Sequence, residues 1–136
     1  MRCLIDTNVL VSAFLWPRST PAQAIKKATT APFSACVSPY SLAELREVVA
    51  RKWPESLGDL DVFIESILID MVVTTKTIGH PLEQAILRDI GDIPILEDAI
   101  GADVDIIISG DKDFTEAGLS HPIVMTPAEF LEQSAK

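Results

Sequence analysis

The chain has 136 residues, of which 48% are hydrophobic and 23% charged, so it has ordinary globular composition and enough length for one domain with a core. Its 11 Lys and Arg stand against 20 Asp and Glu, and the net charge of −9 argues against a protein that coats nucleic acid by bulk electrostatics. No apolar run reaches the roughly 18 residues of a membrane span, and Asp6 comes too early for a signal peptide. We therefore expect a single cytoplasmic domain over residues 1–136 without membrane contact, in which Cys3 and Cys36 are buried, reduced thiols.

Apolar runs of strand length alternate with helical patterns along the whole chain. In chain order the pattern predicts a strand over 2–5, helices over 8–15 and 22–29, a strand over 33–37, helices over 38–52 and 60–70, a strand over 71–74, helices over 82–87 and 93–102, a strand over 106–108, a helical turn over 113–117, a strand over 123–125 and a final helix opened by Thr126-Pro127-Ala128-Glu129. The predicted strands are continuous apolar runs, which is typical of parallel strands buried on both faces with helices on each side of the sheet. In such α/β sheets the ligand lies beyond the carboxyl ends of the strands.

Four acidic residues occupy positions that converge on that edge. Asp6 follows the first strand directly, and Asp111 follows the strand segment Ile106–Ser109 after one glycine. Asp92 precedes the helix over 93–102, and Glu44 lies one to two turns into the helix after the second strand. Carboxylates brought this close need a positive partner, and without His or Cys nearby the partner is a hard cation such as Mg²⁺ or Mn²⁺ rather than zinc.

Each acid also has a simpler structural interpretation. Asp6 and Asp92 can act as helix caps, and Asp111 can be a turn residue after a glycine. Glu44 stands at capping-box spacing from Ser41, although a cap at Ser38 places it too deep in the helix for that role. The metal-site hypothesis therefore rests on the shared location of the four acids.

The segments around these acids carry a further resemblance. They are residues 5–10 (IDTNVL), 38–45 (SPYSLAEL), 88–96 (RDIGDIPIL) and 101–114 (GADVDIIISGDKDF). In this order and at these spacings the chain resembles the PIN domain, in particular the small prokaryotic PIN proteins of the toxin–antitoxin type (VapC-like). The resemblance covers nearly the whole chain and implies a PIN-like, Rossmann-like α/β fold.

The resemblance also implies a function, namely a Mg²⁺- or Mn²⁺-dependent endoribonuclease that is the toxin of a toxin–antitoxin system. Its catalytic and metal-binding residues would be Asp6, Glu44, Asp92 and Asp111. Its supporting residues would be Asn8, Ser109 and Asp113, although Asp113 also fits a helix cap. The expected partners are an RNA substrate, an antitoxin that occupies the acidic cleft and a second copy of the chain in a homodimer.

The chain departs from the family pattern at two positions and leaves two other functions open. Ile93 stands where related chains often have a second acid, which weakens a second metal site and leaves Asp89 as a substitute ligand, and Ser109 stands where Thr is common. A phosphatase or phosphotransferase with an aspartyl nucleophile is disfavoured, because Asp6-Thr7-Asn8 lacks the usual second acid. A non-catalytic module that binds RNA or protein remains an alternative.

The remaining polar and aromatic residues are weaker candidates. Most Lys and Arg side chains are expected to be solvated surface charges, although some could contact RNA phosphates. Trp16 and Trp53 each precede a proline at a helix end and are expected to anchor the core, with an interface role as the alternative. His80 and His121 precede prolines in loops and are not expected to be catalytic.

Overall fold

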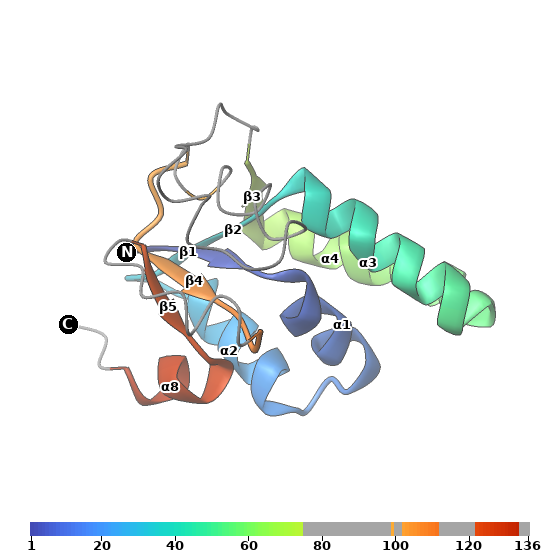
Figure 1. Ribbon diagram of the computed structural model, residues 1–136, viewed down its shortest axis with the longest axis horizontal. Coiled ribbons are helices and arrows are strands. Elements are labelled where there is room, and N and C mark those ends of the chain that lie inside the picture. The colour runs from blue at the N-terminus through green and yellow to red at the C-terminus, as the bar shows by residue number, and fades with distance from the viewer. Residues whose placement is uncertain (75–98, 100–101, 112–121, 134–136) are drawn as a thin grey trace.

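Five short parallel strands form one sheet in the order β3-β2-β1-β4-β5 (Figure 1). The structure is a computed structural model that describes residues 1–74, 99, 102–111 and 122–133. Its elements are β1 (Arg2–Ile5), α1 (Thr7–Leu15), α2 (Thr20–Ala28), β2 (Ser34–Val37), α3 (Pro39–Lys52), a 3-10 turn (Pro54–Ser56), α4 (Leu57–Asp70), β3 (Met71–Val73), β4 (Ile106–Ile108), β5 (Ile123–Met125) and α8 (Pro127–Glu132). The predicted parallel α/β architecture is confirmed.

The register of the sheet fixes which side chains meet at its carboxyl edge. Ile5 at the end of β1 pairs with Val37 of β2 on one side and with Ile108 of β4 on the other. The chain first builds outward from β1 to β2 and β3, and then returns to add β4 and β5 on the opposite side of β1. The strand order therefore reverses between β1 and β4, and the crevice beyond these two strands is the expected ligand site of such a sheet.

Short polar residues begin the helices that follow the strands. The Ser38 hydroxyl accepts a hydrogen bond from the Tyr40 N–H and caps α3, as its position before Pro39 predicted. Thr126 and Glu129 form a capping box at the start of α8, with both reciprocal hydrogen bonds present. The caps start each helix within one or two residues of the strand end, which keeps the helix termini at the carboxyl edge.

The sheet separates two apolar clusters. The larger one joins one sheet face, which includes Cys3, Ile5 and Ile108, to residues of α1, α2, α3, α4 and α8. The smaller one, on the other face, joins Leu4, Cys36 and Ile107 to Ala99 and Val104. Both cysteines are buried free thiols, as predicted.

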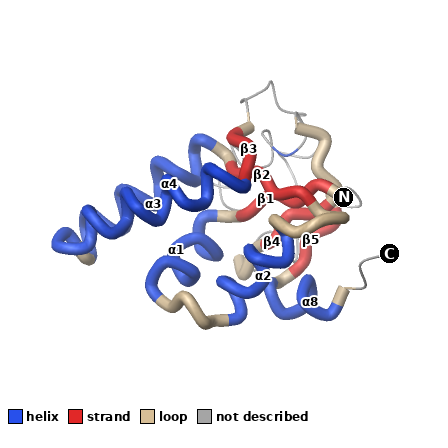
Figure 2. Tube along the Cα trace, turned by 180° about the vertical axis from the view of Figure 1, so that it is seen from behind, coloured by secondary structure: helices blue, strands red, loops and turns tan. Residues whose placement is uncertain are grey.

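Helices α3 and α4 lie side by side and extend away from the sheet as an arm (Figures 1 and 2). Glu47 and Arg51 form a surface ion pair on α3, with 3.8 Å between the charged atoms. Helix α4 begins at Leu57 rather than at residue 60, because the 3-10 turn runs directly into it. Among the described residues, no helix is both long and apolar enough to cross a membrane.

At the other end of the fold, α8 is fastened to α2 by one side chain. The Nζ of Lys27 donates hydrogen bonds to the carbonyl oxygens of Phe130 (2.7 Å), Leu131 (3.3 Å) and Gln133. The same ammonium lies 4.9 Å from the centre of the Phe130 ring. These contacts satisfy carbonyl oxygens at the end of α8, where the Phe130 oxygen also accepts from the Gln133 N–H at 3.0 Å.

Two expectations about burial are wrong. The central strands are buried on both faces, but β3 and β5 lie at the edges of the sheet, and Val72 is 70% and Ile123 47% exposed. Trp16 does not anchor the core, because it is 61% exposed in the loop after α1, whereas Trp53 packs against the larger cluster.

The helix predicted over 82–87, the turn over 113–117 and all but Ala99 and Ala102 of the helix over 93–102 lie outside the described residues.

Candidate active site at the carboxyl edge of the sheet

Asp6 lies at the end of β1, and its buried carboxylate accepts two hydrogen bonds. Its side chain is at the N-cap of α1, and the residue is only 4% exposed. Oδ1 accepts from the Thr7 N–H at 2.8 Å, and Oδ2 accepts from the Ser109 hydroxyl at 2.6 Å. The Asp6 N–H itself donates to the Ile108 carbonyl at 3.0 Å, which continues the β1–β4 ladder into the site. The capping interpretation of Asp6 is therefore correct, and it leaves the carboxylate at the predicted edge.

The turn after β4 connects Asp111 and Asn8 to this carboxylate. The Ser109 hydroxyl, which donates to Asp6, accepts a hydrogen bond from the Asp111 N–H at 3.0 Å. The next residue, Gly110, donates its N–H to Asn8 Oδ1 at 3.4 Å. One buried hydroxyl thus links the first and the last of the predicted acids.

Glu44 reaches the same edge from α3. The side chain is partly buried, and the Tyr40 hydroxyl one turn earlier donates to Glu44 Oε2 at 3.4 Å. The cap at Ser38 fixes the start of α3 and therefore the angular position of Glu44 on the helix. A tyrosine on the same helix is therefore a hydrogen-bond partner of Glu44.

The pKa of Asp6 indicates that two other predicted acids, Asp111 and Glu44, lie close enough to act on its charge. Burial raises the pKa of Asp6 from 3.8 to about 6. The hydrogen bonds from Ser109 and Thr7 lower this pKa, and the negative charges of Asp111 and Glu44 raise it. The structure therefore brings Asp6, Asp111 and Glu44 into electrostatic contact, while Asp92 and Asp113 lie outside the described residues.

The donors at this edge suit a hard cation, although they do not form a finished metal site. Within the described ranges, no three His, Cys, Asp or Glu side chains are grouped closely enough to hold a metal ion. The carboxylates are nevertheless all oxygen donors, and a buried carboxylate beside like charges is stabilised by a cation. In addition, the Thr7 hydroxyl oxygen next to Asp6 is buried without a hydrogen-bond partner. The residues present therefore fit Mg²⁺ or Mn²⁺ better than a softer metal.

Comparison with known proteins identifies the family. The sequence matches the PIN domain over residues 2–113. The chain belongs to the PIN domain family. PIN domains are generally nucleases, which supports a hydrolase as the class of enzyme. A search of curated proteins found no match.

Solved structures confirm the PIN fold. The chain is similar to a chain of the crystal structure of VapBC2 from Rickettsia felis bound to a DNA fragment from their promoter. The TM-score is 0.67 at 17% sequence identity, and the match covers 93% of this chain and 98% of the other. At this identity the likeness concerns the fold, which is the predicted PIN-like α/β sheet.

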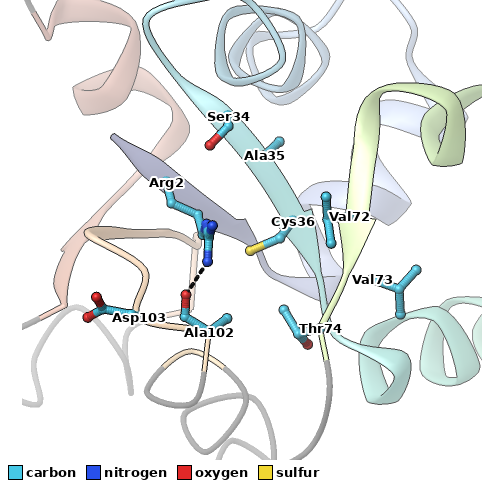
Figure 3. A pocket seen from close by; sticks show the side chains of 9 residues that line it. All are labelled: Arg2, Ser34, Ala35, Cys36, Val72, Val73, Thr74, Ala102 and Asp103. Carbon is cyan, nitrogen blue, oxygen red and sulfur yellow. Dashed lines mark hydrogen bonds between the residues drawn. The ribbon is translucent and has the colours of Figure 1, made fainter.

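A hollow lies on the face of the sheet that carries the smaller apolar cluster, and it is a weaker candidate for the active site. It has a volume of about 510 Å³, and its lining includes Arg2, Cys36, Val72, Thr74 and Asp103 (Figure 3). The Arg2 guanidinium in it donates to the Ala102 carbonyl. Among the described residues that line this hollow, Asp103 is the single acid, so they do not provide the group of carboxylates found at the edge of the sheet.

The structure adds Thr7 and Tyr40 to the PIN site, and sequence reasoning did not assign a role to either. Thr7 contributes a main-chain N–H to Asp6, a contact typical of a capping aspartate at the first helical residue. Tyr40 could have been found from its spacing of four residues before Glu44 on one helix. Both contacts are local in sequence, one between neighbouring residues and one across a single helical turn.

Proposed function

We propose that this PIN domain is a Mg²⁺- or Mn²⁺-dependent endoribonuclease and the toxin of a toxin–antitoxin system. The observation that carries the proposal is Asp6, a buried carboxylate fixed by Ser109 and Thr7 at the switch point of the sheet. The charges of Asp111 and Glu44 act on it. Such an arrangement is unfavourable unless a cation or a proton compensates it, and perturbed carboxylates of this kind occur at functional sites.

In this proposal Asp6, Glu44 and Asp111 bind the cation together with Asp92, which the sequence places at the same edge. A Mg²⁺ or Mn²⁺ held by these acids would polarise the phosphodiester and supply a water of lowered pKa as the nucleophile at phosphorus, with a ribose oxygen as the leaving group. Ser109 keeps the Asp6 carboxylate oriented and couples it to the main chain of Asp111. Asn8 supports the turn after β4 by accepting from Gly110, and Asp113 has the same supporting role by resemblance alone.

The substrate class and the partners follow from charge and from the family. A chain with a net charge of −9 repels RNA, so affinity is expected to be modest, dependent on the cation and weakened by salt. The acidic edge matches a basic side chain of an antitoxin, an Arg or Lys that takes the place of the cation. A homodimer is part of the same proposal, and so is a cytoplasmic location.

The test is cleavage of single-stranded RNA by the wild type and by Asp6→Asn with Mn²⁺, Mg²⁺ or EDTA. Asp61→Asn is the matched control, because it removes one negative charge from an exposed residue on α4. We expect cleavage by the wild type and the control in either metal, none in EDTA, and a loss of at least about a hundredfold in Asp6→Asn.

Three outcomes would contradict the proposal. Equal cleavage by Asp6→Asn would point to a different site or to a contaminant. RNA binding without shortening in Mn²⁺ would favour the non-catalytic module, and a trapped phosphoaspartate at Asp6 would favour the phosphotransferase. A single-stranded DNA of the same sequence, run in parallel, distinguishes a ribonuclease from a general nuclease.

A further inference from the structure

A small cavity opens beside the acidic edge and is not used by the metal-binding residues. It has a volume of about 230 Å³. Its walls come from separate segments of the chain: Asn8, Val9 and Ser12 from α1, Pro21 from α2, Gly110 from the turn after β4, and Pro127 from α8. Because Gly110 lies between Ser109 and Asp111, and Asn8 is two residues after Asp6, the cavity adjoins the site where the phosphodiester would lie.

The walls of this cavity divide into a polar and an apolar part. Asn8 and Ser12 are four residues apart on α1 and therefore lie on one face of the helix, one with an amide and the other with a hydroxyl. The apolar part consists of Val9 and two prolines, each in the first turn of its helix. A flat ligand with apolar faces and a hydrogen-bonding edge matches such walls.

Gly110 leaves room for a ligand at the mouth of the cavity. A Cβ atom added at Gly110 would lie 3.7 Å from Asn8 Nδ2, which is an ordinary van der Waals contact. An alanine here would therefore be tolerated by the fold while it occupies part of the space in front of the amide. Asn8 Oδ1 already accepts from the Gly110 N–H at a long 3.4 Å, so the Nδ2 group is the part of the amide best placed to meet a ligand.

We propose that this cavity is a subsite for one unpaired base of the nucleic-acid substrate, next to the bond that is cleaved. The inference rests on the proposed nuclease function and deepens it. Proteins read unpaired bases through hydrogen bonds to their edges and apolar contact with their faces, and Asn is among the side chains that bond to base edges. The cavity thus selects where the chain cuts, while the acids carry the chemistry.

The experiment is the sequencing of product ends from a randomised single-stranded RNA pool cut in Mn²⁺. Ser12→Leu fills the cavity from α1, and Gly110→Ala fills it from the opposite side. Ser66→Leu, at an exposed position on α4, is the control. We expect the wild type and the control to prefer particular bases at a position flanking the cut by at least about fivefold, and both filled variants to lose most of that preference.

The result that would overturn the subsite is an unchanged base preference in both filled variants, or no preference in the wild type, while cleavage itself proceeds. If the wild type does not cleave at all, the nuclease proposal fails, and the subsite is judged by binding alone. In that case fluorescence anisotropy with labelled single-stranded RNA in EDTA should show binding weakened at least about fivefold by Ser12→Leu and not by Ser66→Leu. Equal binding would overturn the subsite independently.

Discussion

Replacing Asp6 by Asn should stabilise the metal-free protein at neutral pH, although it removes the central residue of the proposed site. The pKa of Asp6 is raised from 3.8 to about 6 in the fold, because burial and the neighbouring acids disfavour the carboxylate. For an acid whose folded pKa is raised, the stabilising contribution is complete below pH 3.8 and is lost as pH rises through about 6. Above that pH the wild type holds an unfavourable charge that the amide does not have.

The size of the effect follows from the same pKa. The difference between 3.8 and about 6 corresponds to about 3 kcal/mol of folding free energy at 1.4 kcal/mol per pH unit, and Asp6 is too buried for solvent to screen much of it. The amide keeps an acceptor for the Thr7 N–H, but its NH₂ group faces Ser109, whose hydroxyl must then accept instead of donate. We expect a net gain of about 1–3 kcal/mol at pH 7.5, or a rise in Tm of about 5–10 °C.

The assay is thermal unfolding of the wild type, Asp6→Asn and the charge control Asp61→Asn in EDTA between pH 4 and pH 8. The stability difference between Asp6→Asn and the wild type should be small near pH 4 and grow up to pH 7. Asp61 pairs with Arg46 on the surface, so its variant should differ from the wild type by less than about 1 kcal/mol. A variant at Asp6 that is less stable than the wild type at pH 7.5, or a difference that does not change with pH, would refute the reasoning.

Three further predictions use other contacts of the fold. Ser109→Ala removes a hydrogen bond that lowers the pKa of Asp6, so RNA cleavage should fall by about 10–100-fold. Because the pKa of Asp6 rises in this variant, the pH profile of cleavage should move measurably to higher pH. Lys27→Met should lower the free energy of unfolding in urea by about 2 kcal/mol, because three carbonyls at the end of α8 lose a charged donor, whereas Lys26→Met on the exposed side of α2 should change it by less than about 0.5 kcal/mol. The thiol of Cys3, with burial raising its pKa to about 12, should stay unreactive toward a disulfide reagent until the protein unfolds.

The strands were predictable because each is a continuous apolar run, but their order was not. Val72 and Ile123 look like core residues in sequence, and they are exposed because β3 and β5 are the edges of the sheet. Whether a strand lies at the edge or in the centre of the sheet depends on which strand it pairs with, and that pairing involves residues distant in sequence. Trp16 was misjudged for a related reason, since whether a bulky residue after a helix meets the core depends on the direction of the following loop.

The sequence predicted that Asp6, Glu44 and Asp111 lie near one another, but it did not predict their hydrogen bonds. That Asp6 follows a strand is visible in the sequence, whereas its 2.6 Å hydrogen bond to Ser109 requires the β1–β4 register that pairs Ile5 with Ile108. A supporting role for Ser109 was expected from family resemblance alone, and the hydrogen bond to Asp6 is the contact through which it would act. The cavity between α1, α2 and α8 was not predictable, because it needs three helices placed relative to one another.

The buried carboxylate also links cation binding to stability. Without a cation, Asp6 destabilises the fold at neutral pH because Asp111 and Glu44 add to the effect of burial. A cation at this edge would neutralise that charge, so it binds the native state preferentially and must stabilise it by linkage. Mg²⁺ or Mn²⁺ should therefore raise the Tm of the wild type, and should leave Asp6→Asn nearly unchanged because that variant has lost both the unfavourable charge and a ligand. An acidic sheet edge whose charges destabilise the fold without a cation is thereby suited to an active site that works only when the cation is bound.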